Sequence, residues 1–328
     1  MTTNAPRDSG AGCSAGKLSN PYGEEVQVLR PMVYWTVIAL IVLAGGYLAV
    51  GLFVAARFSA PNREQPERTP ANVGLEYREL SFESADGMPL EAWWVPPVEG
   101  ESWRAAVLVH GWDGDKSDEH VIETASIYAR AGYGVLLLDL RGNGGSGGER
   151  RTLGYETRDV QGALAWLDAE GFEAGEVVLH GWSMGGSTVV RSALGTGVAA
   201  VIEEAGYADL PLLLRRQLPE TTGLPSFFSP GVLLAAKLFL GFDPWAVQPS
   251  EGAARLREEG VPLFIIHSTD DKVVPFEHAE LFKGAYPEAE LWKVEGLGHV
   301  EAYTHRKYRQ KLLGFLGSKD LSYARDNV

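Results

Sequence analysis

The longest apolar stretch of the chain lies near its N-terminus. Residues 32–56 contain no charged side chain and are bracketed by Arg30 and Arg57. A helix of roughly 25 residues reaches about 37 Å, against about 30 Å of hydrocarbon in a bilayer. The apolar region of a cleavable signal peptide is shorter, at roughly 7–15 residues. The pattern therefore predicts an uncleaved membrane anchor at residues 32–56, preceded by a polar tail at residues 1–31.

The pattern changes twice after this stretch. Residues 57–72 are rich in Pro, Arg and Glu, which predicts an exposed linker. The runs LEYRELSF and MPLEAWWV then alternate apolar and polar residues on either side of Asp86 and Gly87, a pattern typical of a β-hairpin. We expect the folded domain to occupy residues 73–318, followed by a C-terminal tail at residues 319–328.

Within this domain, short runs of Val, Leu and Ile alternate with segments of helical length. The runs are AAVLVH, GVLLLD, EVVLHG, VAAVIE and PLFIIH. Strands that are buried on both faces and alternate with helices form a mostly parallel sheet covered by helices. The pattern predicts an α/β fold.

Composition and charge restrict the possible partners. The 328 residues are 45% hydrophobic and 22% charged, which is ordinary for a globular protein. A net charge of −14 gives no basic surface for a phosphate backbone, so we expect no nucleic-acid partner. Cys13 is the single cysteine, which excludes disulfides within the chain and cysteine-rich metal sites.

A candidate nucleophile follows the third of these runs. Gly181-Trp182-Ser183-Met184-Gly185 has the form G-x-S-x-G between a predicted strand and a predicted helix. In a strand–turn–helix of this kind the serine adopts a strained backbone, and the flanking glycines let strand and helix approach closely. Chance occurrence is the alternative in a chain with 39 glycines, but the context favours a nucleophilic Ser183.

The first run ends in His110 and Gly111, after which the chain turns sharply. We expect the backbone N–H of Trp112 and that of Met184 to be the two donors of an oxyanion hole. His110 itself is expected to brace this loop.

A serine needs an adjacent base, and in this type of fold the partners follow in the order Ser, Asp or Glu, His. Three histidines lie late enough in the chain. His299 ends a predicted strand and enters a glycine-containing loop, whereas His278 and His305 lie in helical patterns and are expected to be solvated. His299 is the predicted base.

Two adjacent carboxylates, Asp270 and Asp271, follow the strand PLFIIH. Either could orient the imidazole, and their chemistry alone leaves the choice open. Weaker alternatives are Glu203, Glu204 and Asp209.

A second glycine motif has the spacing of a dinucleotide site. Residues 142–147 match G-x-G-x-x-G, but GERRTLGYE separates them from the next predicted helix. A dinucleotide fingerprint needs its last glycine to open a helix. A glycine-rich loop near the rim of the active site is the preferred interpretation.

These motifs together resemble the α/β-hydrolase superfamily, and more narrowly its serine-aminopeptidase-like and prolyl-oligopeptidase-like branch, which includes membrane-tethered bacterial members. The resemblance covers roughly residues 75–317 and rests on His110-Gly111, Asp139-Leu140-Arg141-Gly142, LHGWSMGG, HSTDDKVVP and GLGH.

The resemblance implies an α/β-hydrolase fold with Ser183 as nucleophile, His299 as general base and then acid, and Asp271 as the orienting carboxylate. Ser268 stands where the family usually has glycine, a departure that leaves the triad intact. The family's substrates do not carry over, because this branch includes esterases, thioesterases, peptidases and acyltransferases.

Residues 207–259 form an apolar insertion between two predicted strands, where such insertions commonly cover the nucleophile. Phe227, Phe228 and Leu234 are the predicted lining of an acyl pocket; the alternative is that they only pack the cap onto the domain. A second membrane span is not expected, because Lys237 and several Gly and Pro residues interrupt the run.

The sequence thus predicts a single-pass, membrane-anchored serine hydrolase with a small-molecule, lipophilic acyl substrate. A carboxylesterase is the preferred activity, and a peptidase, thioesterase or acyltransferase is the alternative. The alternative that is not an enzyme is a catalytically silent binding module with the same fold. No metal or organic cofactor is expected. Basic residues are nearly balanced across the anchor, but a short tail and a large following domain favour an extracytoplasmic hydrolase.

Overall fold

The computed structural model describes residues 1–2, 22–64, 66, 68–100 and 102–319. The chain forms two compact units, Met1–Tyr47 and Leu48–Val328. Most of the predicted N-terminal tail, and all but the first residue of the predicted C-terminal tail, lie outside the described residues.

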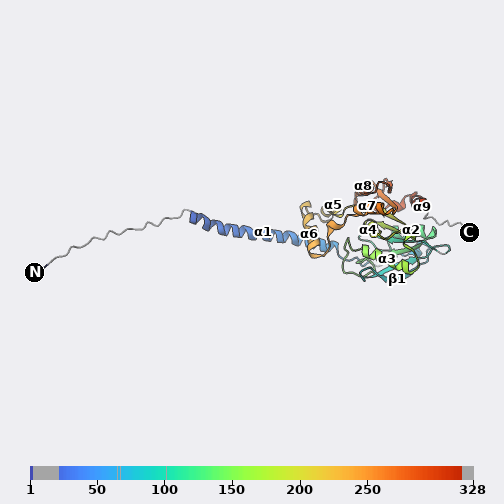
Figure 1. Cartoon of the computed structure of the whole chain (residues 1–328), viewed down its shortest axis with the longest axis horizontal. Coiled ribbons are helices and arrows are strands. Elements are labelled where there is room, and N and C mark those ends of the chain that lie inside the picture. The colour runs from blue at the N-terminus through green and yellow to red at the C-terminus, as the bar shows by residue number, and fades with distance from the viewer. Residues whose placement is uncertain (3–21, 65, 67, 101, 320–328) are drawn as a thin grey trace. The chain divides into compact units, whose positions relative to one another are not determined.

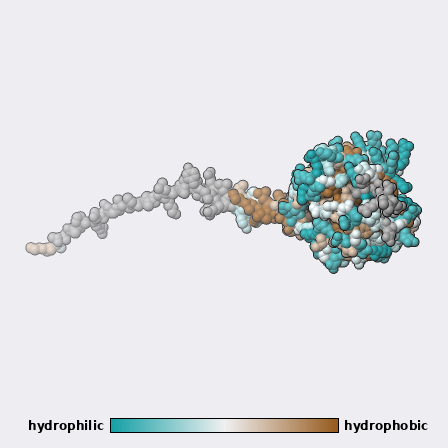
Figure 2. All heavy atoms as spheres, turned by 45° about the vertical axis from the view of Figure 1, so that its right-hand side comes forward, coloured by the Kyte–Doolittle hydropathy of each residue, from teal (hydrophilic) through white to brown (hydrophobic). Residues whose placement is uncertain are grey.

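The predicted anchor is helical. It belongs to α1 (Tyr22–Phe58), and within the described residues Pro31–Phe58 is the one helix that is long and apolar enough by itself to cross a membrane. Its apolar side chains from Met32 to Leu43 are largely exposed and appear as a brown surface in Figure 2. Exposure of this kind is typical of a helix that faces lipid. Farther along the chain, Ser226–Phe239 and Pro244–Glu259 qualify only if they are counted as one span despite the 95° bend between them.

The second unit contains an eight-stranded sheet in the order β1-β2-β4-β3-β5-β6-β7-β8. β2 is antiparallel to both β1 and β4, and the remaining pairs are parallel. The predicted hairpin is confirmed, with Gly87 at φ +78° in its turn. The strands are β1 (Arg78–Glu83), β2 (Pro89–Val95), β3 (Ala105–Val109), β4 (Gly134–Leu138), β5 (Val177–Trp182), β6 (Ala200–Glu204), β7 (Leu263–Ser268) and β8 (Glu290–Val294).

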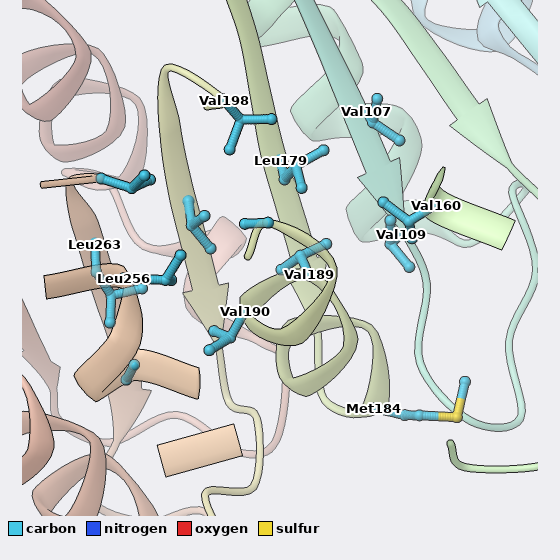
Figure 3. Packing of buried hydrophobic residues seen from close by; sticks show 14 of the residues in the cluster. Val107, Val109, Val160, Leu179, Met184, Val189, Val190, Val198, Leu256 and Leu263 are labelled. Atoms are coloured by element: carbon cyan, nitrogen blue, oxygen red, sulfur yellow. The ribbon is translucent and has the colours of Figure 1, made fainter. Parts of the chain in front are cut away.

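Helices cover both faces of this sheet because alternate residues of its central strands point to opposite sides. Val107 and Val109 of β3 pack in one cluster with Val189 of α4 (Figure 3). Ala106 and Leu108 belong to the cluster on the other face, together with residues of α2 and α9. The helices after α1 are α2 (Glu119–Arg130), α3 (Thr157–Ala169), α4 (Met184–Ser192), α5 (Leu210–Thr222), α6 (Ser229–Phe239), α7 (Pro249–Glu259), α8 (Glu277–Ala285) and α9 (Tyr308–Ser318).

The cap is smaller than the predicted insertion at residues 207–259. α5 and α6 form it, and they lie beside the last turns of α1 (Figure 1). α7 belongs instead to the layer on the sheet, because its Ala253 and Leu256 are fully buried in the same core as Val189.

The last turns of α1 pack closely against α6. A Cβ added to Gly51 would lie 2.5 Å from the Gly231 carbonyl oxygen, so the two backbones are in contact there. Val54 and Ala55 are buried in a small cluster with residues of α5 and α6. Small residues allow this approach of two helices.

The predicted exposed linker at residues 57–72 needs correction. α1 continues to Phe58, and a short 3-10 helix covers Pro70–Val73. Residues 59–63, which we call the strap, are hydrogen-bonded to the glycine-rich loop at residues 142–148 and to Arg151. These hydrogen bonds hold the strap against the loop, because they pair backbone groups of the loop that would otherwise lack a partner.

Candidate active site

Ser183 lies in a tight turn between β5 and α4, as the G-x-S-x-G pattern predicts. Its backbone has φ +53° and ψ −118°, a left-handed conformation that costs a non-glycine residue energy. A Cβ added to Gly185 would lie 2.1 Å from the Val109 carbonyl oxygen, and one added to Gly181 would lie 2.3 Å from the Gly185 carbonyl carbon. Glycine is required on both sides of the serine because strand and helix nearly touch.

Asp271 and His299 are paired. The imidazole Nδ1 lies 2.7 Å from Asp271 Oδ2, although the two residues are 28 positions apart in the chain. An ionised carboxylate can only accept, so Nδ1 carries the proton and Nε2 is left as an acceptor. Asp271 Oδ1 accepts two backbone N–H bonds, from Val273 at 2.8 Å and Val274 at 2.9 Å, which fix the carboxylate.

The neighbouring Asp270 has different partners. Its Oδ2 accepts from the backbone N–H of Gly296 at 2.8 Å and from the Thr269 hydroxyl at 3.0 Å. The Gly296 bond lowers the pKa of the exposed Asp270 carboxyl. The structure therefore brings Asp271, and not Asp270, to the imidazole of His299.

One cavity of about 620 Å³ is lined by four of the predicted site residues. Ser183, His299, Trp112 and Met184 all line it. Within the described residues no hydrogen bond joins the Ser183 hydroxyl to His299. Such contacts are often long in an empty enzyme and tighten when substrate binds.

The two residues predicted to supply oxyanion donors, Trp112 and Met184, both line the cavity with Ser183. Met184 is the first residue of α4, so its N–H is one of the amides that a helix leaves unpaired at its start. Gly111 packs against the serine, since a Cβ added there would lie 3.5 Å from Ser183 Cβ. Trp112 follows it and lines the cavity.

His110 holds the loop that contains Trp112. Its Nδ1 lies 2.7 Å from the Gly111 carbonyl oxygen, and its Nε2 accepts from the Leu140 N–H at 3.1 Å. Both ring nitrogens are thereby used within the fold, which agrees with the predicted bracing role.

The other candidate bases and acids have structural partners. His278 is buried, not solvated as predicted; it accepts from the Ala208 N–H, and burial lowers its pKa to about 4. His305 accepts from the Lys307 N–H at the surface.

Glu203 accepts from the Gly206 N–H, and burial raises the pKa of its carboxyl well above its usual value. The remaining alternatives are Glu204, which accepts from Tyr308, and Asp209, which caps α5.

The predicted acyl-pocket lining is wrong in its residues. Phe227 and Leu234 are 61% and 39% exposed, and Phe228 borders a separate small pocket beside α1. None of the three lines the cavity. Leu234 belongs to α6, whose buried face packs against the last turns of α1, and the two phenylalanines belong to the short 3-10 helix Ser226–Phe228 before it.

The apolar end of the cavity is formed mainly by α5. Its Leu210, Leu213 and Leu214 line the cavity together with Phe58, the last residue of α1, and Leu153. The i, i+3, i+4 spacing in LPLLL is the sequence signal that would have identified this face. Phe58, Leu153 and Leu214 also border a narrow apolar slot of about 60 Å³ beneath α6.

The cavity also has a polar end, which was not predicted from the sequence. Asp118, at the start of α2, and His120 line it with Glu119, Glu301 and Tyr303. Burial raises the pKa of Asp118 to about 6 and lowers that of His120 to about 3. At neutral pH this end is therefore acidic, and the imidazole is uncharged.

The loop at residues 142–147 is not a helix-opening turn, since the next helix, α3, begins at Thr157. It does not line the cavity, contrary to the predicted rim position, and contacts the strap instead. In the part of the chain that the structure describes, no group of three or more His, Cys, Asp or Glu residues is arranged to hold a metal ion.

Comparison with known proteins identifies the family. The model of the alpha/beta hydrolase family matches residues 106–308, which include Ser183, Asp271 and His299. The chain belongs to this family. The predicted α/β-hydrolase fold is thereby confirmed.

Several proteins are similar to this alpha/beta hydrolase. Lysophosphatidylserine lipase ABHD12 of Xenopus tropicalis is 27% identical over 265 residues, which cover 73% of this chain but only 64% of that protein. YqkD of Bacillus subtilis is 27% identical over 253 residues, 74% of this chain and 80% of its own. Among solved structures, the Pyrococcus furiosus esterase Pf2001 superposes with a TM-score of 0.64 at 22% identity, covering 79% of this chain and 97% of the esterase. At that identity the likeness concerns the fold alone.

Proposed function

We propose that this alpha/beta hydrolase is a membrane-anchored serine hydrolase that cleaves carboxylic esters through an acyl-enzyme. The observation that carries the proposal is the 2.7 Å bond between Asp271 and His299, because His299 lines the same cavity as a strained Ser183. A serine hydroxyl is a weak nucleophile unless a base of this kind accepts its proton.

In the first half of the reaction, Ser183 Oγ attacks the ester carbonyl and its proton passes to His299 Nε2. Asp271 keeps the Nδ1 proton in place and stabilises the imidazolium that forms. The oxyanion of the tetrahedral intermediate accepts from the Trp112 and Met184 amides, each donor accounting for about 10²–10³ in rate. His299 then protonates the departing alcohol oxygen as the carbon–oxygen bond breaks.

In the second half, water attacks the acyl carbon and transfers a proton to His299. A second tetrahedral intermediate forms on the same two amides, and its collapse returns the proton to Ser183 and releases the carboxylic acid. His299 mediates each of these proton transfers, and the two amides stabilise both oxyanions.

The cavity and the relatives support a lipophilic ester as substrate. The apolar end, lined by Leu210, Leu213 and Leu214, suits the acyl chain, while the polar end around Asp118 suits the leaving group. The similarity to a lysophosphatidylserine lipase also favours a lipid ester.

The proposal includes a single membrane span in α1, which would hold the enzyme beside such substrates, with the hydrolase on the extracytoplasmic side. The exposed side chains of Phe227, Leu238 and Phe239 on the cap, next to the last turns of α1, support a position at the membrane surface.

Labelling of the full-length protein with a fluorophosphonate probe tests the chemistry. We expect wild type to be labelled and Ser183→Ala to remain unlabelled. Ser187→Ala is a matched control, because Ser187 lies one turn later on α4 and its hydroxyl donates to the Tyr207 carbonyl. Folded wild type without label would contradict the proposal. A series of p-nitrophenyl esters of graded length, with aminoacyl amides beside it, then separates esterase from peptidase activity.

A further inference from the structure

The strap that follows α1 contacts the loop at residues 111–114, which contains the proposed oxyanion donor Trp112. Asn62 Nδ2 donates to the Asp113 carbonyl oxygen at 2.9 Å. The backbone N–H of Asn62 donates to the Gly142 carbonyl oxygen at 2.8 Å, which fixes Asn62 from the other side. The side chain of Asn62 is therefore held between two loops.

Arg151 connects the strap to the same loop. Its backbone N–H donates to the Ser59 carbonyl oxygen at 3.0 Å, and its Nε donates to that of Ala60. The guanidinium Nη1 donates to the Trp112 carbonyl oxygen at 2.9 Å and also pairs with the Asp113 carboxylate. Arg151 is only 6% exposed, so these bonds are largely shielded from water.

The ring of Trp112 is held as well. It stacks on Phe58 with ring centroids 5.3 Å apart, and the Arg151 guanidinium lies 4.3 Å from its centre. The carbonyl, the ring and the following peptide of this residue thus all contact the strap or its Arg151 partner.

These contacts restrict the direction of the Trp112 N–H. An oxyanion donor is effective only when it already points at the position that the oxyanion will occupy, because reorientation during the reaction costs free energy. The N–H belongs to the Gly111–Trp112 peptide, whose carbonyl oxygen lies 2.7 Å from His110 Nδ1. The strap and Arg151 hold the next two carbonyls, so the peptides on both sides of the Trp112 Cα are anchored.

We propose that the strap, and Asn62 in particular, is a positioning element of the active site: it holds the 111–114 loop so that the Trp112 amide faces the oxyanion. The inference rests on the proposed esterase function. It makes the segment directly after the membrane anchor part of the catalytic apparatus.

The test compares three variants of the full-length protein in detergent micelles or nanodiscs. Asn62→Asp keeps the shape of the side chain but replaces the Nδ2 donor with an oxygen that repels the Asp113 carbonyl. Asn62→Ala removes the bond without repulsion. Asn72→Asp is the matched control, because it introduces the same charge at an exposed position whose Oδ1 accepts from the Thr69 N–H.

For Asn62→Asp we expect kcat to fall about 10- to 100-fold, since loss of one donor costs about 10²–10³, while KM changes less than about twofold. Asn62→Ala should lie between Asn62→Asp and wild type, and Asn72→Asp should equal wild type. The affinity for a trifluoromethyl ketone, which forms an oxyanion on the serine, should weaken by the same factor as kcat/KM. A purely structural role would lower Tm without that proportionality.

Two failures can be told apart. Wild type that hydrolyses no ester and takes no fluorophosphonate label overturns the proposed function and this inference with it. Active wild type whose Asn62→Asp variant keeps wild-type kcat and ketone affinity overturns the inference alone. The same holds if Asn72→Asp loses as much activity as Asn62→Asp.

Discussion

Asp270 and Asp271 are adjacent in the chain, but their carboxylates point to different partners. Asp270 accepts bonds from its own loop and from Gly296, whereas Asp271 is 6% exposed and bonded to His299. From sequence, the order of Ser183, a carboxylate and His299 could be predicted. The choice between the two aspartates came from family resemblance, because local chemistry does not specify which carboxylate a distant loop will meet.

Exchange of each carboxylate for an amide tests this distinction. In Asp271→Asn we expect kcat to fall by about 10⁴, because an amide cannot stabilise the imidazolium and favours the wrong tautomer of His299. Asp270→Asn is the control and should keep activity within about threefold, since an amide oxygen still accepts from Gly296. Steady-state ester hydrolysis measures both. Equal losses in the two variants would contradict the assignment.

At the scale of elements, the sheet positions the site and the cap shapes it. Ser183, Asp271 and His299 follow the carboxyl ends of β5, β7 and β8, where parallel strands bring loops together. The strands were predictable because apolar runs of this length and composition are locally distinctive. The cap was predicted as an insertion, but not which of its helices covers the serine.

Substitution in α5 tests the acyl end of the cavity. Leu214 lines the cavity, whereas Leu212, two positions earlier, is 36% exposed and does not. Leu214→Trp should shorten the preferred acyl chain and lower kcat/KM for longer esters at least about tenfold, because each excluded CH₂ forfeits about 0.8 kcal/mol of burial. Leu212→Trp should leave the profile unchanged. The measurement is kcat/KM for p-nitrophenyl esters of increasing chain length. If kcat/KM depends on chain length in the same way in both variants, the acyl chain binds elsewhere.

For the molecule as a whole, buried charge makes stability depend on pH. Burial raises the pKa of Asp118 to about 6 from a reference value of 3.8. The native state then binds the proton more tightly than the unfolded chain between these two values. The contribution of this group to the free energy of unfolding is full below about pH 4 and is lost as the pH rises through 6.

Asp118→Asn should remove this loss of stability at higher pH. At about pH 8 we expect the variant to exceed wild type in free energy of unfolding by on the order of 2 kcal/mol, and at about pH 4 to match it. Asp168→Asn, the same change at an exposed position of α3, should show no such pH-dependent gain. Denaturant titration of the full-length protein at both pH values measures the difference. A gain that is equal at both pH values would show that the charge of Asp118 is not its source.

Local pattern determined the apolar helix, the strands, the glycine turn at Ser183 and the identity of the predicted base, because each depends on residues close together in the chain. Tertiary structure alone decided that Asp271 meets His299, that α5 and Phe58 line the cavity, and that residues 59–63 are bound rather than free. The Asp271–His299 bond joins residues 28 positions apart and the Arg151–Ala60 bond residues 91 positions apart, and Phe58 and α5 are farther apart still. Periodicity and composition carry no information on which distant groups will face each other, since that follows from how the strands order and the helices pack.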